Sequence, residues 1–174
     1  MLLLCGLRIS EVVGNVMGGF FCRRDKEGEE RRWLEITGKG DKTRIVPATH
    51  ELMEELARYR RGKGLAPLPL PGETTPLLLP VGERKEPMTR GAAHAIVKKI
   101  FKNTANLLRL SGGECQAIAD RVGQASAHWL RHTAGSQMAN NALDLRHVRD
   151  NLGHESIGTI SHYLPSSTVK RVSN

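Results

Sequence analysis

The stretch RRWLEITGKGDKTRIVP (31–47) constrains the fold more than any other part of the chain. Apolar and polar residues alternate in 31–37, which predicts a β-strand, and TRIVP (43–47) predicts a second one. Between them, GKGDK (38–42) supplies the glycines of a tight turn. The sequence therefore predicts an antiparallel hairpin that carries lysine at its tip.

Helical periodicity dominates the rest of the chain. Residues 2–5 are expected to end a helix at Gly6, and RISEVVGNV restarts a short one. After Thr49, apolar residues at helical spacing predict a helix that ends at Gly62. Thr89 is expected to cap a long helix to about Leu108, with one apolar side made of Ala93, Ile96, Ile100 and Leu107. Shorter helices are expected at 114–121, 127–140, 144–151 and 156–163.

Two segments are expected to lie outside these helices. Gly18, Gly19 and the run DKEGEE are typical of turns. Residues 63–88 hold six of the eight prolines and predict a surface excursion with one short strand at 77–80. Strands followed by mostly helices indicate an α+β fold, mostly helical, in which a small antiparallel sheet packs with a helical core.

Length and charge narrow the class of protein. A chain of 174 residues is expected to form one domain with a real hydrophobic core. Its net charge of +8 and pI near 9.8 fit binding to nucleic acid, to an acidic partner or to anionic lipid. An ordinary basic protein with solvated lysines is the remaining alternative.

Cysteine use and hydropathy point to the compartment. Cys5, Cys22 and Cys115 are three, far apart and without a C-x-x-C pair, which favours a reducing cytoplasm over a disulfide framework or a zinc ribbon. The apolar opening MLLLCGLRISE meets charge at Arg8 and Glu11, so neither a signal peptide nor a membrane span is expected.

The usual cofactor and metal motifs are not met. GKGDKT lacks the glycine that a phosphate loop needs, because Trp33 stands five residues before Gly38. His147 and His154 have no acidic third ligand close by in sequence, and the acidic residues do not cluster as magnesium requires. We expect no cofactor and no metal.

Six positions could carry chemistry, and each also has an ordinary explanation as a surface pair, a solvated lysine, a helix face, a cap or a core tyrosine. They are Arg8, Lys39, His128, Arg131, His154 and Tyr163. Two arginines, a lysine and two histidines would suit a phosphate, since arginine holds two oxygens and fixed donors stabilise added negative charge. A tyrosine beside them supplies a nucleophile for a covalent intermediate.

Four motifs in order resemble the tyrosine recombinases, or phage-type integrases, whose catalytic domain is related to type IB topoisomerases. GLRISE (6–11) resembles the first arginine motif, and TGKGDKTRIVP (37–47) resembles the hairpin with the catalytic lysine. HWLRHT (128–133) resembles the H-x-x-R box, and LGHESIGTISHY (152–163) the closing motif with the tyrosine. The resemblance covers nearly the whole chain and implies the DNA breaking-rejoining enzyme fold.

The resemblance implies a role for each residue. Arg8 and Arg131 would clamp the scissile phosphate, and Tyr163 would attack it to leave a 3′-phosphotyrosyl link. Lys39 would protonate the leaving 5′-oxygen, with His128 as base or hydrogen-bond partner and His154 as a second phosphate donor. Glu11, three residues after Arg8, is expected to stabilise the surrounding structure rather than to react. In the H-x-x-R box, Trp129 and Leu130 are expected to point into the core, away from the phosphate.

The resemblance also implies partners and a domain plan. Residues 1–174 would be the catalytic domain, N-terminally truncated, without the domain that clamps the other face of DNA. Double-stranded DNA is the expected partner, with no membrane. The chain alone is expected to be a monomer, the full-length protein a homo-tetramer on DNA, and the location the bacterial cytoplasm at the nucleoid. Two alternatives stay open: DNA relaxation of the type IB topoisomerase kind, and a DNA-binding integrase remnant without catalysis.

Overall fold

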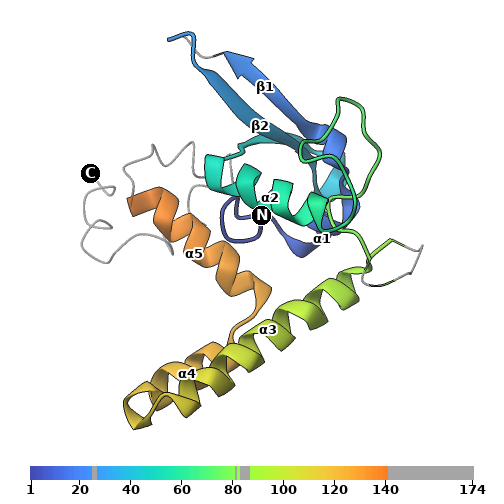
Figure 1. The fold of residues 1–174 in the computed structure, drawn as a ribbon. Coiled ribbons are helices and arrows are strands. Elements are labelled where there is room, and N and C mark those ends of the chain that lie inside the picture. Colours follow the sequence, from blue (N-terminus) through green and yellow to red (C-terminus); the bar gives the residue numbers. More distant parts are fainter. Residues whose placement is uncertain (25–26, 81, 83–86, 141–174) are drawn as a thin grey trace.

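The computed structural model describes residues 1–24, 27–80, 82 and 87–140. In chain order a short helix leads into a small sheet, and helices follow (Figure 1). The elements are α1 (Ile9–Gly14), η1 (Met17–Gly19), β1 (Phe20–Arg24), β2 (Glu30–Thr37), η2 (Lys39–Asp41), β3 (Thr43–Pro47), α2 (His50–Arg61), α3 (Arg90–Leu110), η3 (Gly113–Cys115), α4 (Gln116–Gln124) and α5 (Ala127–Asn140). The α+β class, helical with a small antiparallel sheet, is confirmed.

The sheet has the order β1-β2-β3, and both pairings are antiparallel. The predicted hairpin is confirmed, with Thr37 opposite Thr43 at the base of its loop. Sequence patterning missed β1, where Gly18 and Gly19 predicted only a turn. Two arginines end that strand, so pairing with β2 rather than an apolar alternation defines it.

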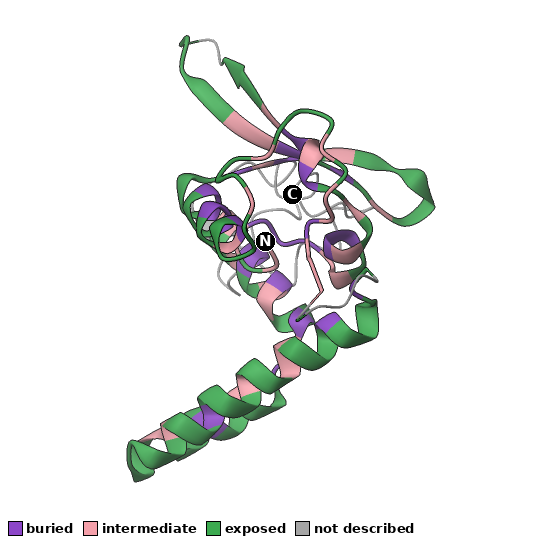
Figure 2. Cartoon of the chain, turned by 45° about the vertical axis from the view of Figure 1, so that its right-hand side comes forward, coloured by how far each residue is buried: buried purple, intermediate pink, exposed green. Residues whose placement is uncertain are grey.

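The hydrophobic core lies between the inner face of the sheet, α1 and α2 (Figure 2). The sheet contributes alternate residues, as a half-buried sheet should. On α2, which confirms the helix predicted after Thr49, Thr49 Oγ1 accepts a hydrogen bond from the backbone N–H of Leu52 at 3.3 Å and caps the helix. The best-buried core side chains are Leu7, Met17, Leu34, Ile36, Val46, Leu77 and Cys5.

A buried ion pair holds the proline-rich excursion against the core. The Arg60 guanidinium is 2% exposed and bonds both carboxylate oxygens of Glu73, at 2.8 and 3.0 Å. Its Nε also donates to the carbonyl oxygen of Ala66 at 2.6 Å. The strand expected at 77–80 is wrong: Leu77 is buried and donates to the Asn15 carbonyl, but these residues form bends rather than a strand.

Helices α3 and α4 form an antiparallel arm that projects from the core (Figure 1). Thr89 caps α3 as predicted, accepting from the Ala92 N–H at 3.1 Å. The expectation of one apolar buried side on α3 is only partly right. Ala93 is buried, but Ile100 is 58% and Leu107 66% exposed, so α4 leaves much of this side of α3 uncovered. Figure 2 shows this arm as mostly exposed.

Helix α5 turns back from the arm toward the N-terminal segment (Figure 1). Its extent confirms the helix predicted at 127–140. Trp129 is 49% exposed, so the expectation that it points into the core is wrong. The buried positions among the described side chains of α5 are instead Ala127, Arg131, Ala134 and Gly135, and the first three are spaced four and three apart as one helix face. The helices expected at 144–151 and 156–163 lie outside the described residues.

Candidate active site

Arg8 stands immediately before α1 and is bound to the first turn of that helix. Glu11 Oε2 accepts from the backbone N–H of Arg8 at 2.7 Å, and Oε1 pairs with Arg8 Nη1 at 3.0 Å. A carboxylate at this place suits a helix N-terminus. The Arg8 side chain keeps 40% of its surface exposed, so it can meet a ligand from solvent.

Glu11 is almost fully buried and bridges two arginines. Its side chain is 1% exposed. Arg44, on β3, donates from Nη1 to Oε1 at 2.6 Å and from Nη2 to Oε2 at 2.9 Å. Burial raises the pKa of this carboxyl, but the hydrogen bonds and charges of Arg44 and Arg8 outweigh burial, so the pKa lies below its usual value. Glu11 is therefore a fixed anion that joins α1 to the hairpin.

Arg44 is a residue of the candidate site that sequence reasoning missed. It shares the core side of β3 with Val46, since residues two apart on a strand face the same way. A charged residue on the core side of a strand needs a buried partner. This alternation of 43–47 is the sequence signal from which Arg44 could have been identified.

Lys39 lies in the loop between β2 and β3, exposed at the surface. The loop closes through Gly38 N–H, which donates to the Lys42 carbonyl at 2.9 Å. Gly40 and Asp41 take positive φ values of 71° and 54°. Gly40 suits such a conformation, and aspartate tolerates it better than most side chains.

Asn15 fastens the base of this loop to the end of α1. Its Nδ2 donates to the Thr37 carbonyl, and the Thr37 N–H donates to its Oδ1, both at 2.9 Å. The same Nδ2 also reaches the Glu11 carbonyl at 2.9 Å. Asn15 thus fixes the position of the Lys39 loop relative to the helix that begins after Arg8.

Arg131 reaches the segment in front of Arg8. It is 3% exposed, and its Nη1 donates to the carbonyl oxygen of Gly6. Gly6 has a φ of 61°, the left-handed region that favours glycine. The H-x-x-R box on α5 and the first arginine motif therefore meet in space although they lie far apart in the chain.

His128 is exposed on α5 and is bonded to His132, one turn further along. Their Nε2 atoms are 2.7 Å apart, and the rings meet edge to face. In this contact one imidazole nitrogen donates and the other accepts. His132 was not singled out from the sequence, although its spacing of four from His128 places both on one helix face.

The structure thus joins Arg8, Glu11 and Arg44 by direct contacts, places Arg131 at Gly6, and ties the Lys39 loop to α1. His154 and Tyr163 lie outside the described residues. Among the residues that the structure describes, no group of three or more His, Cys, Asp or Glu side chains could hold a metal ion. No helix in that part of the chain is long and apolar enough to cross a membrane.

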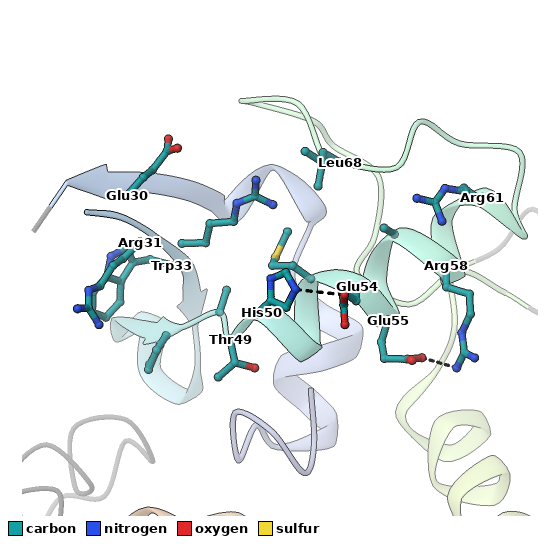
Figure 3. Close-up of a pocket in the computed structure, with 15 residues that line it drawn as sticks. Glu30, Arg31, Trp33, Thr49, His50, Glu54, Glu55, Arg58, Arg61 and Leu68 are labelled. Atoms are coloured by element: carbon teal, nitrogen blue, oxygen red, sulfur yellow. Dashed lines mark hydrogen bonds and ion pairs between the residues drawn. The ribbon is translucent and has the colours of Figure 1, made fainter. Parts of the chain in front are cut away.

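A wide hollow lies elsewhere, between β2 and α2 (Figure 3). It has a volume of about 1020 Å³. Its lining includes His50 and Glu54, whose Nε2 and Oε1 atoms are 3.1 Å apart. Of the candidate residues that the structure describes, Arg8, Lys39, His128 and Arg131, none lines this hollow. We therefore place the candidate site around Arg8 and not in the hollow.

The candidate site combines arginines from two distant segments with a lysine from a hairpin loop. This is the arrangement expected from the sequence for a tyrosine recombinase catalytic domain. The phage integrase family model matches residues 1–169. The chain therefore belongs to the phage integrase family, and the resemblance to tyrosine recombinases is confirmed.

Curated relatives agree with this membership. Tyrosine recombinase XerD of Lacticaseibacillus casei is 30% identical over 159 residues, which cover 91% of this chain and 45% of the relative. Tyrosine recombinase XerC of Agrobacterium fabrum is 30% identical over 169 residues, covering 95% and 44%. The chain spans about half the length of the curated relatives it matches.

Solved structures share the fold. The Tn1549 transposon integrase in complex with transposon right end DNA superposes with a TM-score of 0.60 and 17% identity, over 99% of this chain and 57% of that one. XerH site-specific recombinase bound to difH substrate gives 0.58 and 21%, over 97% and 42%. XerA recombinase gives 0.60 and 21%, over 97% and 51%.

Proposed function

We propose that this chain is the catalytic part of a tyrosine-type site-specific recombinase that cleaves and rejoins DNA through a 3′-phosphotyrosyl intermediate. The observation that carries the proposal is the meeting of the two arginine motifs, where Arg131 bonds Gly6 two residues before Arg8. An arginine from each of these two motifs would suit the charge of a phosphate that gains a fifth oxygen.

Each candidate residue takes one role in the proposed reaction. The Tyr163 oxygen attacks phosphorus, the phosphorus–O5′ bond breaks, and Lys39 gives a proton to the leaving oxygen. Arg8 and Arg131 hold the non-bridging oxygens, with His154 as a further donor. His128 accepts the tyrosine proton or hydrogen-bonds the tyrosine, since a neutral imidazole carries one acceptor nitrogen. One phosphodiester replaces another, so the reaction needs no nucleotide triphosphate.

The proposed partner is double-stranded DNA. The net charge of +8 supports it, as does the fold shared with the Tn1549 and XerH proteins, which were solved with DNA. We propose that the full-length protein works as a homo-tetramer on DNA, that this chain alone is a monomer, and that it acts at the nucleoid in the bacterial cytoplasm. Three free cysteines and bacterial relatives support that location.

A nicked suicide duplex tests the function. When the scissile phosphate lies next to a nick, the short 5′ fragment diffuses away and a covalent intermediate cannot be resealed. When the duplex contains a cognate site, we expect a covalent protein–DNA adduct that survives denaturant. Retardation without an adduct would favour a DNA-binding remnant instead. Relaxation of supercoiled plasmid without site preference would favour the topoisomerase alternative.

A further inference from the structure

We propose that Arg44 is a positioning residue, which acts through Glu11 to place both Arg8 and the Lys39 loop. This inference rests on the proposed function, since it assigns Arg8 and Lys39 to the reaction. Arg44 itself need not touch DNA, because its guanidinium is occupied by the buried carboxylate.

The first support is the geometry of the carboxylate. Both Arg44 nitrogens bond it, at 2.6 and 2.9 Å, and a bidentate arginine fixes the carboxylate plane. The same two oxygens then receive Arg8 Nη1 at 3.0 Å and Arg8 N–H at 2.7 Å. The orientation that Arg44 imposes on Glu11 is therefore passed to both the backbone and the side chain of Arg8.

The second support is the balance of charge. Glu11 carries one negative charge between two guanidiniums, so the three residues together keep one formal positive charge. The Arg44 side chain is 14% exposed and the Arg8 side chain is 40% exposed. Arg44 is therefore the more buried counter-charge of the Glu11 carboxylate, and Arg8 carries the charge that is more accessible from solvent. Without Arg44, the Glu11 carboxylate would draw on Arg8 alone and reduce the positive charge offered to a phosphate.

The third support is the contact with the Lys39 loop. A Cβ added at Gly38 would lie 3.0 Å from Glu11 Oε1 and 3.6 Å from Arg44 Nη1. Gly38 has extended backbone, so its conformation does not require glycine, but a side chain here would crowd the Glu11 carboxylate. The residue before Lys39 thus rests on the ion pair, and the pair sets where the loop begins.

The test compares Arg44→Met with Arg60→Met in the whole 174-residue chain. Both changes remove a mostly or fully buried arginine that bonds a carboxylate twice, but of the two only Arg44 contacts Glu11. Single-turnover cleavage of the nicked duplex is measured at saturating DNA, with Kd taken separately. For Arg44→Met we expect cleavage to fall about 10²-fold, the usual effect of a misplaced reacting group, with Kd within a few-fold. Arg60→Met should cleave within a few-fold of the parent.

A duplex with sulfur at the bridging 5′ position adds a readout that a loss of stability would not change. A thiolate leaves without a proton, so sulfur removes the need for Lys39 but not for Arg8. Partial rescue of Arg44→Met is expected, and Arg44→Lys should fall between the parent and Arg44→Met. Equal losses in Arg44→Met and Arg60→Met, or no rescue by sulfur, would overturn the inference. Arg44→Lys serves the same comparison if Arg44→Met does not fold.

NMR of the chain without DNA distinguishes a failure of the proposed function from a failure of the positioning inference. The side-chain carboxyl carbon of Glu11 should titrate below its ordinary range in the parent chain. In Arg44→Met its pKa should rise, and the amide signals of Gly38 and Lys39 should move. If the parent never cleaves DNA but these shifts occur, the function is wrong and the positioning stands. Unmoved signals in Arg44→Met would contradict the positioning itself.

Discussion

Arg131 on α5 donates a hydrogen bond to the carbonyl oxygen of Gly6, a contact between residues 125 positions apart. The contact is buried, and it brings the second arginine motif to the segment that leads into Arg8. Gly6 presents that carbonyl from a left-handed turn. One side chain therefore has a structural bond and, in the proposed reaction, a phosphate to hold.

Arg131→Lys should be far more damaging than its conserved charge suggests. A lysine has one ammonium group, which cannot serve the Gly6 carbonyl and span two phosphate oxygens. We expect the single-turnover cleavage rate to fall by about 10²–10³-fold. The matched control is Arg121→Lys, at an exposed position on α4, which should stay within a few-fold of the parent. Cleavage by Arg131→Lys within a few-fold would mean that Arg131 is only a structural residue.

Lys39→Ala should be rescued by sulfur at the bridging 5′ position, since a thiolate leaves without the proton that lysine supplies. Arg8→Ala should not be rescued, because its defect is in charge stabilisation. Cleavage rates of the two variants on oxygen and sulfur duplexes provide the measurement. Equal rescue of both, or rescue of neither, would remove Lys39 from the role of general acid.

Glu73→Gln should destabilise the fold near neutral pH. Hydrogen bonds from Arg60 hold the pKa of Glu73 at about 2, against 4.5 ordinarily. A lowered pKa contributes stability above the unfolded value, and this contribution is lost as pH falls toward the folded value. We expect a loss of about 1–3 kcal/mol at pH 7, since the buried Arg60 guanidinium keeps its carbonyl partners but loses its counter-charge. That difference from the parent should shrink as pH falls from 4.5 toward 2.

Urea unfolding of both chains between pH 7 and pH 3 measures this difference. Glu11 also has a lowered pKa, but it is present in both chains and cancels in the comparison. Glu114→Gln, at an exposed position in η3, is the control and should change little at any pH. A Glu73→Gln difference that does not vary with pH would show that the Arg60 pair does not set the pKa of Glu73.

Much of this fold follows from local patterns. The hairpin, α2, α3 and α5 were predictable because each has its own cap, turn or apolar repeat, and these local signals agree with the final packing. The strand β1 was not, since its arginine-rich sequence is ordered by pairing with β2. The burial of α3 and Trp129 was misjudged because periodicity states which residues share a face, not how much of that face a neighbour covers.

The site divides in the same way. Motif spacing led to Arg8, Lys39, His128 and Arg131 because each stands inside a recognisable local motif. The partners of these residues come from distant segments, so Arg44 and Gly6 could not be paired with them from the chain alone. The alternation of β3 pointed to Arg44 as a core-side charge but not to Glu11 as its partner.

The chemical identity of a trapped adduct tests the central claim most directly. The parent chain is reacted with the nicked duplex, digested with trypsin and nuclease, and the peptide that retains a nucleotide 3′-phosphate is sequenced by mass spectrometry. We predict that the modified residue is Tyr163, and that Tyr163→Phe forms no adduct while it binds DNA nearly unchanged. A nucleotide on any other residue, or an adduct of Tyr163→Phe that survives denaturant, would contradict the account.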